Sequence, residues 1–193
     1  MAAGSLLMAA AVSLFLYNQR EQRQAAASVQ QLMPQMAEAI QQRQEAPTEP
    51  VLLSPEEAAY REMPVKEIDG HAYIGVIGIE PLGLELPVMS DWTYPQLQIA
   101  HCRYSGSVYS DDLVVMAHNY PKHFGKLKEL RFEDPVTFTD MDGNTVAYQV
   151  VALDVLAPEA VEEMTAGAYD LTLFTCTYGG ENRVVLRCDR AEE

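Results

Sequence analysis

The first apolar run of the chain contains no charged residue. It covers residues 2–17 (AAGSLLMAAAVSLFLY), and polar residues resume at Asn18. Sixteen residues in an α-helix span roughly 24 Å, slightly less than a hydrocarbon core of about 30 Å. We predict a transmembrane anchor over residues 1–18. Two alternatives stay open: a cleavable signal peptide with a small-residue site at 25–27, and a buried helix of a soluble domain, which the lack of a polar stripe disfavours.

The next segment is rich in Gln, Ala, Glu and Met, which are good helix formers. Its composition predicts a helix that is interrupted at Pro34, because proline removes a backbone hydrogen bond. Three further prolines between 47 and 55 end any helix, and one short helix is expected over 55–63 with proline in its first turn. We interpret residues 19–64 as a stalk and linker that hold a domain away from the membrane.

Beyond this point the pattern changes to short β-branched and aromatic runs, which are typical of strands. Two pairs of these runs flank glycine-containing turns, as in β-hairpins. Short helices are expected over 122–130 and 158–166. Many short strands, few helices and no long βαβ period predict a mainly β domain over 65–193, a closed β-barrel with two or three short helices and an N-terminal helix before it. The expected strands are 73–79, 84–88, 113–116, 136–139, 145–154, 171–175 and 183–187.

Charge and composition exclude several functions. The 193 residues carry a net charge of −15, and residues 35–193 hold 27 acidic but only 11 basic side chains. Nucleic-acid binding needs a basic footprint on the phosphates, so we expect no nucleic-acid partner. We also expect no metal or cofactor, because His, Cys and carboxylates do not cluster at ligand spacing. The turn at 140–144 lacks the later glutamate of an EF-hand loop.

The odd count of three cysteines leaves at least one thiol without an intramolecular disulfide. Cys176 ends an apolar strand and precedes a Gly-Gly turn, where a thiol is accessible. If the strands at 171–175 and 183–187 pair as a hairpin, Arg183 faces Cys176 across its mouth. A guanidinium in that position can stabilise negative charge on the sulfur or donate to a developing oxyanion.

A disulfide between Cys176 and Cys188 is the alternative to a reactive thiol. In the hairpin, Cys188 lies five residues beyond Arg183, or about 16 Å at strand rise, whereas disulfide Cα atoms approach within about 7 Å. The hairpin therefore excludes this disulfide, and we expect Cys188 in the core. Cys102 stays undecided between an exposed thiol and a disulfide with Cys188.

A thiol nucleophile needs a nearby base or proton donor. His118 directly follows a buried strand and projects from its end, as Cys176 does, and the ends of neighbouring barrel strands converge at one rim. His101 is the rival, although no strand is predicted before it. We expect His123 on the surface, and His71 in a structural or solvated position at a turn.

These residues stand in motifs that together resemble one family. The segment TLFTC at 172–176 is similar to the TLxTC signature of the sortases, membrane-anchored cysteine transpeptidases of Gram-positive bacteria. VVMAHNY carries the strand-end His118 before an F..L..L pattern, and NRVVLR carries Arg183. The apolar segment and stalk also match, and the similarity covers about 73–190. Ala117 stands where the family usually has glycine, which bears on local backbone geometry and not on the chemistry.

The resemblance implies a sortase-type barrel and its mechanism. Cys176 attacks a carbonyl in an LPxTG-like sorting motif, usually between Thr and Gly, and forms a thioacyl-enzyme. His118 protonates the leaving amine and then acts as base for the incoming one. Arg183 hydrogen-bonds the substrate backbone or the oxyanion, and Thr175 helps to shape the oxyanion region. Arg187 is either a second contact or a surface or packing residue.

The resemblance also implies partners and location. Substrates are surface proteins that bear a sorting signal, and the acceptor is an amine of a peptidoglycan precursor or a pilin. The enzyme is expected in the cell membrane as a single-pass protein with its catalytic domain extracellular. The short segment 157–170 and the lack of an obvious lid motif loosely favour a housekeeping or class-D-like enzyme. Two other functions stay open: a different secreted cysteine peptidase or L,D-transpeptidase, and a non-enzymatic anchored β-domain with structural cysteines.

Overall fold

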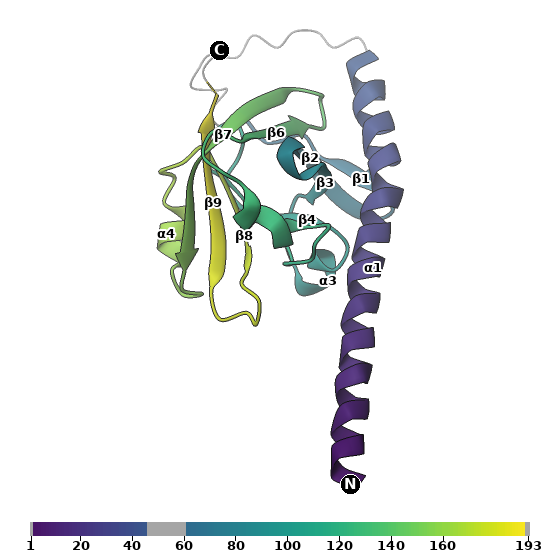
Figure 1. Cartoon of the computed structure of the whole chain (residues 1–193). Helices are drawn as coiled ribbons and strands as arrows, with labels where there is room; N and C mark the ends of the chain where they lie inside the picture. Colours follow the sequence, from purple (N-terminus) through teal and green to yellow (C-terminus); the bar gives the residue numbers. More distant parts are fainter. Residues whose placement is uncertain (1, 46–60, 192–193) are drawn as a thin grey trace.

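A nine-stranded sheet curls into a barrel, and one long helix runs along its side (Figure 1). The computed structural model describes residues 2–45 and 61–191. The strands are β1 Lys66–Ile68, β2 His71–Ile79, β3 Leu84–Met89, β4 His101–Ser105, β5 Leu113–Met116, β6 Pro135–Asp140, β7 Thr145–Leu156, β8 Leu171–Cys176 and β9 Arg183–Arg190.

The strand order is β1-β2-β3-β4-β5-β8-β9-β7-β6, and β2 also pairs with β6. This second pairing closes the eight strands from β2 to β6 into a ring, with β1 as an extra edge strand on β2. The predicted closed β-barrel is therefore confirmed. Closure brings β2 and β6 very near each other at Gly75, where a Cβ would collide with the carbonyl oxygen of Thr139, so glycine is required there.

The helices inside the domain are short. The segment expected at 122–130 forms a 3₁₀ helix, and the one expected at 158–166 forms a single α-helical turn. A further 3₁₀ turn, the short helix α3 and the strands β1 and β4 were not predicted. The helix expected over 55–63 lies mostly outside the described residues. The bounds are α1 Ala2–Glu45, η1 Glu80–Leu82, α3 Tyr94–Leu97, η2 Phe124–Glu129 and α4 Val161–Thr165.

Helix α1 continues through Pro34, so the predicted interruption is wrong. Pro34 is exposed, while Leu32 and Met36 on either side are buried against the barrel. This packing stabilises both flanking turns and outweighs the lost backbone hydrogen bond. With Ala25 and Val29, these residues recur every three or four positions and form one buried stripe of the helix. Residues assigned to the stalk thus pack against the domain.

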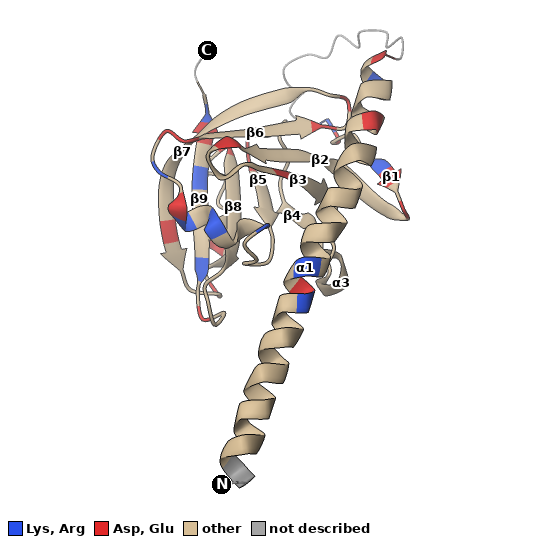
Figure 2. Cartoon of the chain, turned by 45° about the vertical axis from the view of Figure 1, so that its right-hand side comes forward, with Lys and Arg blue, Asp and Glu red and all other residues tan. Residues whose placement is uncertain are grey.

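The N-terminal turns of α1 extend beyond the barrel and carry no charged residue (Figure 2). Residues 4–18 are exposed. Within residues 2–45 and 61–191, no helix has both the length and the apolar character needed to cross a membrane.

The first five residues of β8 are buried, because both faces of this strand are covered: Phe174 packs in a separate cluster with Met164 of α4, whereas Leu171 and Leu173 lie in the apolar core of the barrel interior. Cys188 is fully buried in this core, as predicted, and is a free thiol. Cys102 is buried and free as well, so it forms no disulfide with Cys188. Since Cys176 is also free but only half-buried, it is the one of the three cysteines that solvent can reach.

Candidate active site

Strand register brings the predicted site residues to one rim of the barrel. β5 and β8 are parallel, with Met116 opposite Phe174. Continuing this register by two residues places His118 beside Cys176, and one residue further Asn119 Nδ2 donates to the Thr177 carbonyl at 3.3 Å. On the other side of β8, Cys176 pairs with Arg183 of β9. The hairpin pairing predicted from the sequence is confirmed.

Cys176, His118, Arg183 and Thr175 line one cleft of about 210 Å³. Helix α4 and the β3–β4 segment supply its apolar walls. Trp92 stacks on Tyr104 with ring centroids 5.9 Å apart, and Tyr104 meets Phe174 edge to face at 5.3 Å. The remaining lining residues are Tyr94, Leu97, Met116, Ala117, Pro158, Val161 and Met164. The thiol of Cys176 therefore lies in a cleft whose walls are mostly apolar and aromatic.

The two basic side chains of the cleft, His118 and Arg183, differ in their surroundings. His118 is half-buried, and desolvation lowers the pKa of its imidazole below 6.5, partly opposed by the carboxylate of Glu21. His118 is therefore mostly neutral at pH 7. The guanidinium of Arg183 donates to the carbonyl oxygens of Gly180 and Asn182, both at 3.2 Å. These contacts anchor one nitrogen of the guanidinium in the β8–β9 turn.

Thr175 stabilises the rim by a buried hydrogen bond. Its hydroxyl donates to the Ala117 carbonyl at 2.8 Å, and the Ala117 amide donates to the Phe174 carbonyl at 3.2 Å. The two bonds join β8 to the residue just before His118. Ala117 is buried, so a small side chain suits this position, where the sortases usually have glycine.

Two other histidines occupy places that the sequence did not indicate. His123 is fully buried, so the prediction of a surface residue is wrong. Its ring lies 4.5 Å from that of His101, which is also fully buried and begins β4. Burial lowers the pKa of His123 to about 4 and that of His101 well below 6.5. Neither residue lines the cleft, so His101 is not a rival to His118 there. His71 is half-buried at the start of β2.

Arg187 is a packing residue, one of the two roles considered for it. Its side chain is buried and does not line the cleft. The guanidinium donates to the carbonyls of Glu163 at 2.7 Å and Met164 at 3.3 Å, and to the Thr172 hydroxyl at 3.1 Å. It thereby attaches α4, one wall of the cleft, to β8.

Sequence reasoning missed the aromatic wall formed by Trp92 and Tyr104. These residues lie in a mostly polar stretch without a clear strand pattern, and isolated aromatic residues in such a stretch were the only available signal.

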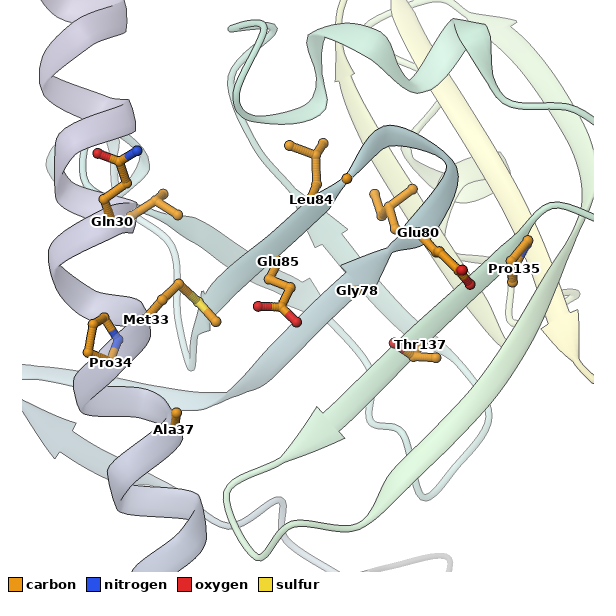
Figure 3. A pocket seen from close by; sticks show the side chains of 13 residues that line it. Gln30, Met33, Pro34, Ala37, Gly78, Glu80, Leu84, Glu85, Pro135 and Thr137 are labelled. Carbon is orange, nitrogen blue, oxygen red and sulfur yellow. The ribbon is translucent and has the colours of Figure 1, made fainter.

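A larger cavity of about 890 Å³ lies where α1 crosses β2, β3 and β6, with Met33 of α1 on one side and Glu85 of β3 on the other (Figure 3). It shares no lining residue with the cleft. In the described parts of the chain, no group of three or more His, Cys, Asp or Glu side chains is placed to hold a metal ion.

Comparison with known proteins agrees with this geometry. The family model of the sortase domain matches residues 77–191, which is more than half of the chain. The chain belongs to the sortase family. Family membership argues against the L,D-transpeptidase alternative, and the half-buried free thiol of Cys176 against a purely structural role.

Solved structures of sortases share the fold. Sortase C1 from Streptococcus agalactiae is 25% identical over 66% of this chain and 72% of its own, with a TM-score of 0.57. Sortase A from Corynebacterium diphtheriae is 18% identical over 95% of this chain and 96% of its own, with a TM-score of 0.57. Sortase C from Clostridium perfringens is 18% identical over 94% of this chain and 99% of its own, with a TM-score of 0.54. A search of curated proteins found no match.

Proposed function

We propose that this sortase is a cysteine transpeptidase that cleaves an LPxTG-like sorting motif and transfers the upstream protein to an amine. The observation that carries the proposal is the convergence of Cys176, His118 and Arg183 on one cleft with apolar walls. A nucleophile, a proton carrier and a fixed cation are the three groups that acyl transfer through a thioester needs.

The proposed reaction has two halves. In the first, the Cys176 thiolate attacks the carbonyl carbon of the motif's threonine, and Arg183 stabilises the oxyanion or holds the substrate backbone. The C–N bond breaks as His118 donates a proton to the leaving glycine nitrogen, which leaves a thioester on Cys176. In the second half, an incoming amine attacks the thioester while His118 removes its proton, and the thiolate leaves. The lowered pKa of His118 suits its role as base, whereas its role as acid depends on the smaller protonated fraction.

Membership of the sortase family suggests the partners and the location. We propose sorting-signal-bearing surface proteins as donors, and an amine of a peptidoglycan precursor or a pilin lysine as acceptor. The catalytic domain then acts outside the cell at the membrane, and the anchor over residues 1–18 stays a prediction. The exposed apolar turns of α1 support a contact with lipid, because large exposed apolar surfaces mark interaction sites.

Mass spectrometry of the acyl-enzyme tests the proposal. The full chain is incubated with an LPxTG-like peptide, with and without an amine acceptor such as triglycine. We expect a covalent adduct on Cys176 without acceptor and a ligated product with it. Cys176→Ala abolishes both, whereas Cys102→Ala, at a buried thiol outside the cleft, keeps both. Lack of an adduct on the unmodified chain, or an adduct that persists in Cys176→Ala, contradicts the proposal.

A further inference from the structure

Helix α1 reaches the loop that carries His118. The buried stripe of the helix includes Ala25, which is 1% exposed and whose backbone lies against the ring of His123. Residues four apart share a helix face, so Glu21 continues this stripe one turn towards the N-terminus. Glu21 is half-buried, whereas residues 4–18 before it are exposed. An acidic side chain therefore lies near the end of the part of α1 that packs against the barrel, where Gln19 is the one earlier residue among 4–20 that is also half-buried.

The carboxylate of Glu21 lies between two tyrosines. The hydroxyl of Tyr17 donates to Glu21 Oε1 at 2.6 Å. From the barrel side, Tyr120 faces the same carboxylate, and burial together with the negative charge of Glu21 raises the pKa of Tyr120. The ring of Tyr120 lies 5.0 Å from that of His118. A carboxylate, a phenol and an imidazole thus follow one another from α1 to the cleft.

The charge of Glu21 also acts on His118 directly. Burial is the larger influence and lowers the pKa of His118, whereas the Glu21 carboxylate raises it. A negative charge held near an imidazole favours its protonated form. The other ionisable groups that face His118 are Tyr120 and His123 of its own loop, His101 of β4, and Cys176 and Arg183 across the cleft.

We propose that Glu21 is a positioning residue for His118, and that its carboxylate, placed by α1, favours the imidazolium that protonates the leaving amine. The inference rests on the proposed function, because only a reaction with a leaving amine needs an imidazolium. It gives α1 a catalytic role besides any role as a stalk. Displacing this helix from the barrel removes the negative charge and weakens proton donation.

Nuclear magnetic resonance titration of His118 tests this inference without substrate. The full chain carrying Cys176→Ala is compared with the same chain carrying Glu21→Gln in addition. We expect the midpoint of His118 to fall by roughly half a pH unit, or about threefold in the imidazolium fraction above the midpoint. Glu38→Gln is the matched control, because Glu38 is exposed on the same helix and bonds to Gln42, and it leaves the midpoint unchanged. Glu21→Asp keeps the negative charge, so its His118 midpoint stays close to that of the parent chain.

Kinetics of the chain with Cys176 intact give a second readout. At pH 8 Glu21→Gln lowers kcat for acylation about threefold with KM unchanged, since the substrate contacts remain. A His118 midpoint that is the same in Glu21→Gln and in the parent chain overturns the inference. So does a role in packing alone, which lowers Tm equally in Glu21→Gln and Glu21→Asp and leaves both midpoints unchanged. Because the titration needs no substrate, absence of an acyl-enzyme counts against the proposed function and not against this effect of Glu21.

Discussion

The buried pair His101 and His123 predicts that acid destabilises the fold. His123 titrates near 6.5 when unfolded and at about 4 in the folded chain, because burial disfavours the imidazolium. The unfolded chain therefore binds this proton first as the pH falls. A difference of about 2.5 pH units corresponds to about 3 kcal/mol of stability that is fully present above pH 6.5 and is lost as the pH falls towards 4. His101 acts in the same direction.

Urea unfolding of the full chain at several pH values between 7.5 and 4.5 measures this loss. We expect the free energy of unfolding to fall steeply with pH in the parent chain and less steeply in His123→Gln, which does not titrate. The carboxyl groups contribute equally to both chains, so subtracting the curve of His123→Gln from that of the parent chain removes their contribution and leaves that of His123. His71→Gln, at a half-buried histidine outside the pair, is the control for replacing a histidine by glutamine. Parallel curves for the parent chain and His123→Gln would refute the reasoning.

Three further predictions concern the cleft and its support. Arg183→Ala lowers kcat for acyl-enzyme formation by about 10² to 10³, and Arg183→Lys recovers part of it; equal rates in all three chains would contradict a role in oxyanion stabilisation. Arg187→Met loses the buried hydrogen bonds to α4 and lowers the free energy of unfolding by about 3 kcal/mol in urea titrations. An unchanged free energy of unfolding would contradict the packing role of Arg187. Tyr104→Ala removes a cleft wall and raises KM for the sorting peptide about tenfold. The rate at which a small reagent alkylates the Cys176 thiol changes little, because that reaction does not need the wall.

Much of the site was predictable because its elements are local or related by simple register. The hairpin that pairs Cys176 with Arg183 needs only two β-rich runs and a glycine turn between them. The position of His118 needed one more step, namely that strand ends converge at a rim, and the parallel pairing of β5 with β8 confirms it. The aromatic wall at Trp92 was not predictable, because its segment has no strand or helix periodicity.

The sequence by itself determined the strands, the hairpins and the motifs that carry the predicted cysteine, histidine and arginine, since each depends on residues close together in the chain; the pairings that close the barrel, such as β2 with β6, join distant segments. Only the tertiary structure decided what α1 covers. His123 looks like a surface residue in its own loop, but Ala25, about a hundred positions earlier, lies over it and removes it from water. Burial and the charge next to an active-site group depend on segments that meet only when the chain folds, so local pattern cannot specify them.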